Sequence, residues 1–375
     1  MRRLVVCADG TWNKDEQEAD GSGRTNVALL KEHLPKVDPA GVEQIVYYHP
    51  GVGTGNWWDR ATGGAFGTGI SKNIKDCYAF LVQTYRPGDQ LFFFGFSRGA
   101  YTARSLAGLV RNCGVLRRAA GSAPGAPLSE GEKKAVAEAY DYYRDREDDT
   151  HPSSPKAVAW RAARSVDVPI KCLGVWDTVG ALGVPTRGLV GWLSRKRHGF
   201  HDVNLSSQVE NAFHALAIDE RRKPFAPSLW EVKADDPALA SGKWRVEQRW
   251  FAGVHSNVGG GYADRGLSNL ALRWVVDRAT QCGLHFDAAF VAQVHAGCDC
   301  KATLYDSFKP VFKPLGAFER TIDAKRDGVL TFEDVDDTAA ERCCAALPQK
   351  YRPKNFLQWW ERQPTKWEKL QRPVD

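Results

Sequence analysis

Short apolar runs alternate along the chain with longer segments in which apolar positions recur at helical spacing. The apolar runs lie at 3–8, 44–48, 91–96, 168–176 and the end of 244–254. Continuous apolar runs of this length are typical of strands buried on both faces of a sheet. The segments with helical spacing lie between them, at 26–33, 74–85, 98–110, 129–148 and 267–279. The alternation predicts an α/β fold with a mostly parallel central sheet and helices on both faces.

The length and composition indicate how this fold is divided. The chain has 375 residues, of which 43% are hydrophobic, and this suffices for one large core. We expect one catalytic domain over 1–330, with helical insertions at about 117–164 and 185–243 that form a cap over the sheet edge. Residues 331–375 are rich in charge, Pro and Trp, and we expect a C-terminal extension that is packed on the domain or partly flexible.

The charge of the chain argues against a nucleic-acid partner. The net charge of +6 comes from 51 basic and 45 acidic residues, and the densest basic run is only Arg195–Arg197. The segment 189–197 joins apolar residues, a Trp and three bases, which is typical of a peripheral membrane contact and also of an ordinary amphipathic surface helix. We favour the ordinary helix. Oligomeric state is not indicated.

The nine cysteines are odd in number and irregular in spacing, which favours a reduced compartment without disulfides. Cys298 and Cys300, with His295 nearby, are too few for a recognisable metal site, so we expect no metal and no cofactor. The apolar run at the N-terminus stops at Asp9, too early for a signal peptide, and no run is long enough to span a membrane. We therefore expect a cytoplasmic location, with export by a signal-independent route left open.

The clearest chemical signal is the G-x-S-x-G sequence at 95–99, Gly-Phe-Ser-Arg-Gly. It follows the most apolar run of the chain and opens a helical segment, which is the strand–turn–helix setting of a nucleophile elbow. The turn is tight, which explains the glycines on both sides of Ser97. The structural alternative is a serine that caps the helix in an ordinary turn; we expect Ser97 to be a nucleophile.

A serine nucleophile needs a base, and His255 is the best placed of nine histidines. It directly follows an apolar run and precedes a glycine-rich stretch that allows the backbone to bend toward the sheet edge. His214 is the second candidate, but its spacing to apolar neighbours favours a helical core histidine.

The acid of a triad orients the imidazole and stabilises its charged form. Asp177 follows the apolar run 168–176 and lies between Ser97 and His255 in the chain, as the fold requires. An aspartate that only caps a turn is the structural alternative. Asp219 and Asp264 remain the other candidate acids.

Acyl transfer also requires hydrogen-bond donors for an oxyanion. The backbone N–H of Arg98 is the first expected donor. Gly10 and Thr11, at the end of the first predicted strand, are candidates for the second, with Asp9 bracing their loop. An ordinary turn explains the same residues. Asn257 and Asp264 are further candidates for a supporting role.

Several motifs occur together in a characteristic order: DGTWN at 9–13, YYHPGVGTG at 47–55, GFSRGAYTAR at 95–104, GVWDTVG at 174–180 and HSNVGGGY at 255–262. With these motifs, residues 2–280 resemble the uncharacterised α/β-hydrolase domain family DUF2235. That family is similar to the catalytic domain of the Tle1-type phospholipase effectors of bacterial type VI secretion. The resemblance implies an α/β-hydrolase-like fold and a Ser-Asp-His triad, carried onto Ser97, Asp177 and His255. Asn257 stands where members often have Asp.

The function we expect is hydrolysis of carboxylic esters of the lipid or phospholipid type through an acyl-serine intermediate. One alternative is a catalytically idle hydrolase fold that serves as a binding or regulatory module. Another is a hydrolase of a different acyl substrate, such as a peptide or polyester. The expected partner is a small-molecule or lipid ester. The motifs do not separate the last alternative from lipid-ester hydrolysis, because substrate choice lies in the insertions.

Overall fold

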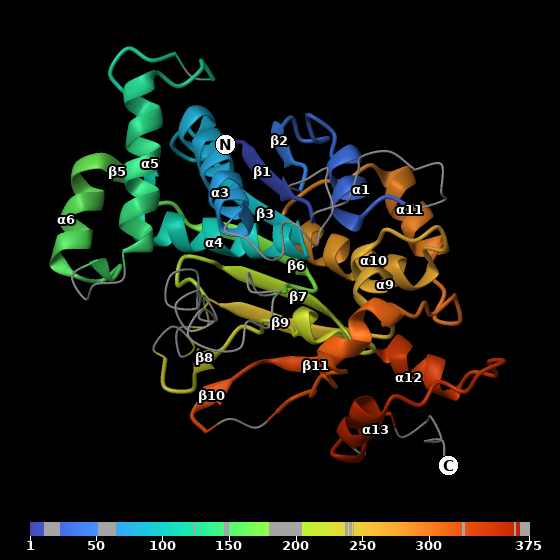
Figure 1. Ribbon diagram of the computed structural model, residues 1–375. Helices are drawn as coiled ribbons and strands as arrows, with labels where there is room; N and C mark the ends of the chain where they lie inside the picture. The colour runs from blue at the N-terminus through green and yellow to red at the C-terminus, as the bar shows by residue number, and fades with distance from the viewer. Residues whose placement is uncertain are drawn as a thin grey trace.

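A seven-stranded sheet forms the centre of the molecule (Figure 1). The computed structural model describes residues 1–10, 23–51, 65–123, 125–145, 150–179, 205–236, 239, 242, 244–324, 327–363 and 365–367. Its strands, in spatial order, are β2 (Gln44–His49), β1 (Arg3–Ala8), β3 (Gln90–Phe96), β6 (Ile170–Trp176), β7 (Asn211–Ala217), β9 (Arg245–Phe251) and β11 (Glu333–Val335). Every neighbouring pair is parallel, which confirms the predicted parallel sheet.

Both faces of the sheet are buried because the apolar runs supply side chains to each face in turn. In β1, Leu4 and Val6 belong to one core cluster, whereas Val5 and Cys7 belong to another. Successive side chains of a strand point to opposite faces, so a continuous apolar run is what a sheet covered on both sides requires.

Helices cover both faces. The helices α3 (Ala65–Thr84) and α4 (Arg98–Cys113) pack on one face, while α1 (Asn26–Glu32), α10 (Gly266–Gln281) and α11 (Ala288–Ala296) pack on the other (Figure 1). The expected α/β class, with helices on both sides of the sheet, is confirmed.

The insertion expected at 117–164 lies at the end of α4 that is remote from Ser97. It carries α5 (Glu130–Arg144) and α6 (Pro155–Arg164), flanked by the short strands β4 (Val115–Leu116) and β5 (Ser165–Val166), and in Figure 1 it lies on the left. Near the last turn of α4, Asn112 donates through Nδ2 to the Thr150 carbonyl at 2.9 Å, and its own carbonyl accepts from Arg161 at 3.2 Å. This insertion therefore covers the far end of α4.

The expectation of a helical insertion over 185–243 is wrong for its second half. Residues 180–204 lie outside the described part of the chain, but 211–217 form β7, a strand inside the sheet. After β7 come a 3-10 helix, η2 (Lys223–Phe225), and β8 (Val232–Lys233), which pairs with β10 (Val329–Leu330). The sequence NAFHALA gives both helical and strand spacing, and its polar His214 interrupts the apolar run.

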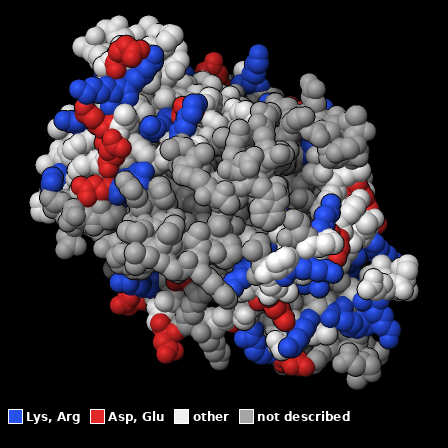
Figure 2. Space-filling view, viewed as in Figure 1, with Lys and Arg blue, Asp and Glu red and all other residues white. Residues whose placement is uncertain are grey.

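The end of the chain adds to the sheet and to the core. Strand β11 pairs with β9, and it follows the 3-10 helix η3 (Pro310–Leu315) and precedes α12 (Asp337–Cys344) and α13 (Lys354–Glu361). A third core cluster joins Phe356, Trp359 and Trp360 to Leu216 of β7 and Trp250 of β9. Lys and Arg side chains gather over the end with α12 and α13 in Figure 2, interspersed with Asp and Glu. Among the helices that the structure describes, none combines the length and apolar character needed to span a bilayer.

The strand order reverses next to β1, which pairs with β2 on one side and with β3 on the other. In open parallel sheets such a switch point leaves a crevice beyond the carboxyl ends of the strands, where ligands bind. Ala8 ends β1 and Phe96 ends β3, so this switch point lies between Asp9 and Ser97.

Candidate active site

Ser97 occupies the sharp bend between β3 and α4. Its φ of 57° and ψ of −119° are unusual for a residue with a side chain and store backbone strain. The side chain makes no capping hydrogen bond to α4, so the helix-capping interpretation lacks its contact. The residue is 8% exposed at the start of the helix, where the backbone N–H groups favour negative charge.

The two glycines beside Ser97 allow three backbone segments to approach closely. A Cβ atom added to Gly99 would lie 2.0 Å from the carbonyl oxygen of Ala8, and one added to Gly95 would lie 2.4 Å from the carbonyl oxygen of Gly99. Neither position accepts a side chain. The close contact of α4 with the end of β1 brings Asp9 beside the bend.

His255 is the first residue of the short helix α9 (His255–Gly259), which follows β9. It is 5% exposed, and its ring lies between Phe96, with ring centroids 4.6 Å apart, and Phe225 at 4.9 Å. Phe96 directly precedes Ser97, so the histidine lies at the bend that holds the serine. Burial lowers the pKa of His255 and outweighs the hydrogen bond with Asp177, which raises it.

Asp177 follows β6 and contacts the histidine. Its Oδ2 atom lies 2.5 Å from Nδ1 of His255, and its Oδ1 atom accepts from the backbone N–H of Ala217 at 3.1 Å. The carboxylate is fully buried, and its backbone has a φ of 38°. Burial alone would raise the pKa of Asp177, but the charge of Arg320 and the hydrogen bond with His255 hold it below its ordinary value. With Nδ1 engaged, Nε2 is the ring nitrogen left for proton transfer.

Arg320 is a site residue that sequence reasoning missed. It is 1% exposed, and its two terminal nitrogens donate to the two carboxylate oxygens of Asp177, Nη1 to Oδ1 at 2.6 Å and Nη2 to Oδ2 at 3.0 Å. In the sequence it is one arginine among many in a segment without an apolar pattern. No signal in a single sequence identifies it.

Glu220 was missed for the same reason. Its buried carboxylate accepts from the backbone N–H of His255 at 3.2 Å and from the Ser307 hydroxyl at 2.9 Å. Arg222 donates to both oxygens at 2.8 Å. Burial alone would raise the pKa of Glu220. The hydrogen bond and the charge of the Arg222 guanidinium oppose this effect, and the pKa is lowered to about 2. The carboxylate therefore anchors the start of α9 as an anion.

The other candidate acids make contacts of a different kind. Asp219 accepts from the Gly253 N–H at 2.7 Å and the Tyr351 hydroxyl at 2.9 Å, and burial raises its pKa. Asp264 accepts from the N–H groups of Gly266 at 3.0 Å and Thr303 at 2.9 Å. Both brace loops next to α9.

His214 lies in a strand, β7, and not in a helix, but it is a buried core residue as expected. The Thr178 N–H donates to its Nε2 at 3.1 Å, and its Nδ1 lies 3.1 Å from Oε1 of Gln248. Burial lowers the pKa of His214 to about 3, so its imidazole is neutral.

The loop after β1 is braced by Asp9, which is 2% exposed. Its Oδ2 accepts from the hydroxyls of Thr25 at 2.5 Å and Tyr48 at 2.9 Å. Its Oδ1 accepts from the N–H of Gly10 at 2.7 Å, so that N–H is already engaged. Thr11, the other candidate donor, lies outside the described residues.

Asn257 has a structural set of contacts. Its Oδ1 accepts from the N–H groups of Val254 and Tyr305, both at 3.3 Å, and its Nδ2 donates to the Thr303 carbonyl at 3.1 Å. It ties α9 to the segment that follows α11.

In the described ranges no three His, Cys, Asp or Glu side chains gather as a metal site requires, and His295 pairs with Asp277 at 3.2 Å.

The chain is similar to several known proteins. An uncharacterized protein of Saccharomyces cerevisiae, YEL023C, is 27% identical over 245 residues, which are 60% of this chain and 32% of that protein. The chain thus spans about a third of that relative.

Two solved structures are also similar. An uncharacterized protein from Pseudomonas aeruginosa matches with a TM-score of 0.45 and 18% identity, over 79% of this chain and 48% of that one. The Tle1 effector bound to the VgrG spike from the Type 6 secretion system matches with a TM-score of 0.39 and 17% identity, over 69% and 51%.

The family match covers most of the chain. Residues 2–278 match the family described as the catalytic domain of Tle1-like phospholipase effectors of the type VI secretion system (T6SS). These residues run from β1 into α10 and carry Ser97, Asp177 and His255, whereas Arg320 lies beyond them. The chain therefore belongs to the family of Tle1-like phospholipase effector catalytic domains.

Proposed function

We propose that the protein is a serine hydrolase of lipid carboxylic esters in which Ser97, His255 and Asp177 form the catalytic triad. Membership of the phospholipase family supports a lipid-ester hydrolase in general. The observation that carries the triad is the 2.5 Å contact between Nδ1 of His255 and the buried Asp177 carboxylate, beside the strained bend that holds Ser97.

The first half of the reaction is acylation. Nε2 of His255 takes the proton from the Ser97 hydroxyl as its oxygen attacks the ester carbonyl carbon, and Asp177 stabilises the imidazolium that forms. The imidazolium then returns its proton to the leaving alcohol, and the carbon–oxygen bond to that alcohol breaks. The product is an acyl ester on Ser97. Water attacks this ester in the second half, and His255 takes its proton. The imidazolium then returns that proton to the Ser97 oxygen as the acyl bond breaks, which releases the carboxylic acid and restores the serine.

The oxyanion of each tetrahedral intermediate needs two donors. We assign the first to the backbone N–H of Arg98, the first residue of α4, where the helix dipole adds to the attraction. Since the N–H of Gly10 is engaged by Asp9, we assign the second to the N–H of Thr11. Asp9 is then a brace for the loop, held by Thr25 and Tyr48.

A lipid substrate would require the protein to contact a lipid surface. The segment 189–197, with its apolar residues and three bases, lies outside the described residues. We keep a peripheral contact with a membrane as part of the proposal, because a phospholipid ester must be reached at a lipid surface.

A fluorophosphonate probe tests the proposal, because it labels only an activated serine. We expect the wild-type protein to be labelled and to hydrolyse p-nitrophenyl esters and phospholipid vesicles, and Ser97→Ala to lose both properties. Ser105→Ala is the matched control, since Ser105 lies in α4, the helix that follows Ser97, is buried and has no catalytic contact in the proposal. Absence of wild-type labelling would favour the idle binding module, and persistent labelling of Ser97→Ala would refute the assignment.

The chemistry of the ester is tested by a graded panel of acyl chain lengths. A lipid hydrolase should prefer long chains and act faster on vesicles than on short soluble esters. Preference for peptide or polyester substrates would keep the triad but replace the substrate class.

A further inference from the structure

We propose that Arg320 is a positioning residue of the active site, which holds the Asp177 carboxylate in the orientation that His255 requires. The residue lies beyond the family match, so the C-terminal part of the chain completes the catalytic centre. This inference rests on the proposed function, since it assigns a partner to the acid of the proposed triad.

The guanidinium is fixed by four hydrogen bonds. Besides the two to Asp177, Nη1 donates to the Ala217 carbonyl at 2.8 Å and Nη2 donates to the Phe225 carbonyl at 2.6 Å. Ala217 ends β7, and Phe225 lies in η2. A planar fork bound on two sides has one orientation, and its two parallel N–H bonds impose that orientation on the carboxylate.

The Arg320 guanidinium is also linked to His255 through Phe225. The Phe225 carbonyl accepts from Arg320, and the ring of the same residue packs edge-on against His255 at 4.9 Å. Arg320 therefore contacts both the acid that holds the imidazole and the segment that covers it.

A charge is needed at this place for a physical reason. The Asp177 side chain is fully buried, and an isolated buried carboxylate takes up a proton because it loses its hydration. A neutral carboxyl group cannot stabilise an imidazolium. The Arg320 side chain is also fully buried, so the attraction between the two charges is weakly screened.

The C-terminal region holds the backbone of Arg320 in place. Asn355, in α13, donates through Nδ2 to the carbonyl of Arg320 and to that of Ile218, both at 3.0 Å. Tyr351 donates to Asp219, the next residue after Ile218. These ties clamp the segment around 320 to the end of β7.

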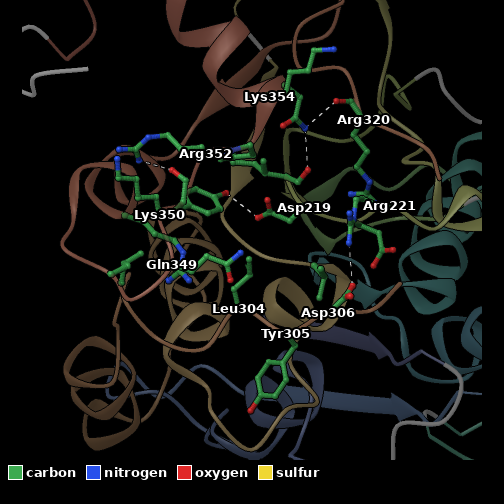
Figure 3. A pocket seen from close by; sticks show the side chains of 18 of the residues that line it. Asp219, Arg221, Leu304, Tyr305, Asp306, Arg320, Gln349, Lys350, Arg352 and Lys354 are labelled. Atoms are coloured by element: carbon green, nitrogen blue, oxygen red, sulfur yellow. Dashed lines mark hydrogen bonds and ion pairs between the residues drawn. The ribbon is translucent and has the colours of Figure 1, made fainter. Parts of the chain in front are cut away.

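A pocket of about 950 Å³ is lined by these clamp residues and by other residues of the C-terminal region. In Figure 3 the labelled Arg320 and Asp219 border it together with Lys350, Arg352 and Lys354, which come from the tail. Another buried arginine, Arg342, lines the same pocket, but its Nη1 donates to the carbonyls of Cys300 and Ala302 and not to the triad. Arg342 is therefore a matched control for the loss of a buried arginine from this region.

The first measurement compares kcat and KM of Arg320→Met, Arg320→Lys and Arg342→Met on a soluble p-nitrophenyl ester. We expect Arg320→Met to lose about 100-fold or more in kcat while KM changes by less than about threefold, because only the transition state uses the ion pair. Arg320→Lys keeps the positive charge but lacks the planar fork, so its loss of kcat should be smaller than that of Arg320→Met. Arg342→Met should stay within about threefold of the wild type.

The pH profile distinguishes a positioning role from a structural one. Removing a positive charge next to Asp177 makes the Asp177–His255 pair bind a proton more tightly. The acid limb of kcat/KM should therefore move to higher pH in Arg320→Met and stay in place in Arg342→Met. An unmoved acid limb in Arg320→Met, with an activity loss equal to that of the control, would overturn the proposal.

A double variant keeps the test decisive if Arg320→Met folds poorly. Asp177→Asn/Arg320→Met removes both charges, so no uncompensated charge stays buried. If Arg320 acts through Asp177, the double variant should lose no more than about threefold beyond Asp177→Asn alone. Losses that multiply would show that Arg320 acts elsewhere. Failure of the proposed function would look different, because the wild-type Ser97 would then not be labelled by the fluorophosphonate.

Discussion

The backbone N–H of Ser97 donates to the carbonyl of Trp176 at 3.1 Å. Trp176 ends β6 and Asp177 follows it, while Ser97 follows β3, the neighbouring strand. The proposed nucleophile and acid thus leave adjacent parallel strands at the same level. His255 follows β9, two strands beyond β6, and reaches back over the end of the sheet to Asp177.

The strained backbone at Ser97 should lower the free energy of unfolding of the protein. A φ of 57° disfavours any residue with a Cβ, so Ser97→Gly should relieve strain that Ser97→Ala retains. Both variants lack the nucleophile, and we expect Ser97→Gly to unfold in urea with a free energy about 1 kcal/mol higher than Ser97→Ala. Equal stabilities of the two variants would contradict strain at this bend.

The close approach of β1 and α4 predicts a large effect of one methyl group. Gly99→Ala forces a Cβ to within 2.0 Å of the Ala8 carbonyl oxygen, so backbone must move. We expect a loss of at least about 2 kcal/mol in the free energy of unfolding, or failure to fold.

Gly131→Ala is the matched control for that change. Gly131 lies in α5, and an added Cβ there meets no atom within 4 Å. This substitution should stabilise the protein by about 0.5 kcal/mol, because alanine favours a helix more than glycine does. Thermal melts of the two variants that shift in the same direction would refute the contrast.

The pH dependence of the activity follows from the burial of His255. The base works when it is neutral, and its pKa is lowered from the ordinary value of 6.5. The neutral ring therefore persists to lower pH, and kcat/KM should fall on the acid side with an apparent pKa below 6.5. A fall centred above 6.5 would contradict the assignment of the base.

The aromatic cover of that ring is a separate prediction. Phe225→Ala admits water to His255, which reduces the cost of charging the ring, so the acid limb should move to higher pH. Phe312→Ala is the control, because the Phe312 ring contacts Phe225, at 6.5 Å between centroids. The Phe312→Ala profile should match the wild type; a shift equal to that of Phe225→Ala would exclude cover by Phe225 as the cause.

The third core cluster, which contains Phe356, predicts that the last part of the chain stabilises the whole domain. Phe356 is fully buried and packs on Trp360 and Trp367, with ring centroids 5.4 Å and 5.8 Å away. Phe356→Ala should cost about 3–5 kcal/mol by urea denaturation. Leu357→Ala, at the partly buried edge of the same cluster, should cost clearly less. A loss for Phe356→Ala as small as that for Leu357→Ala would contradict a core role for the tail.

Local patterns in the sequence predicted the sheet and the placement of the proposed triad. Each of Ser97, Asp177 and His255 directly follows an apolar run, and the ends of parallel strands meet at one edge. The type of residue and its position after a strand were therefore enough to select them. The glycines around Ser97 were predicted for the same reason, because a sharp bend has a local signature.

Other parts of the molecule had no such signature. The strand β7 carries the polar His214, whose burial depends on Thr178 and Gln248 from other strands or loops. The tail was expected to be packed on the domain or partly flexible. Its entry into the core was not predicted, because its aromatic residues find their partners on β7 and β9, far away in the sequence.

The amino-acid sequence by itself determined which residues end the strands and where the chain bends, because burial and spacing are local properties. Only the tertiary structure decided which charges meet. Asp177 and Arg320 are 143 positions apart, and their ion pair exists because Asn355 and Tyr351 clamp the C-terminal region to the end of β7. Such a contact depends on the path of distant loops, and no pattern around either residue encodes that path.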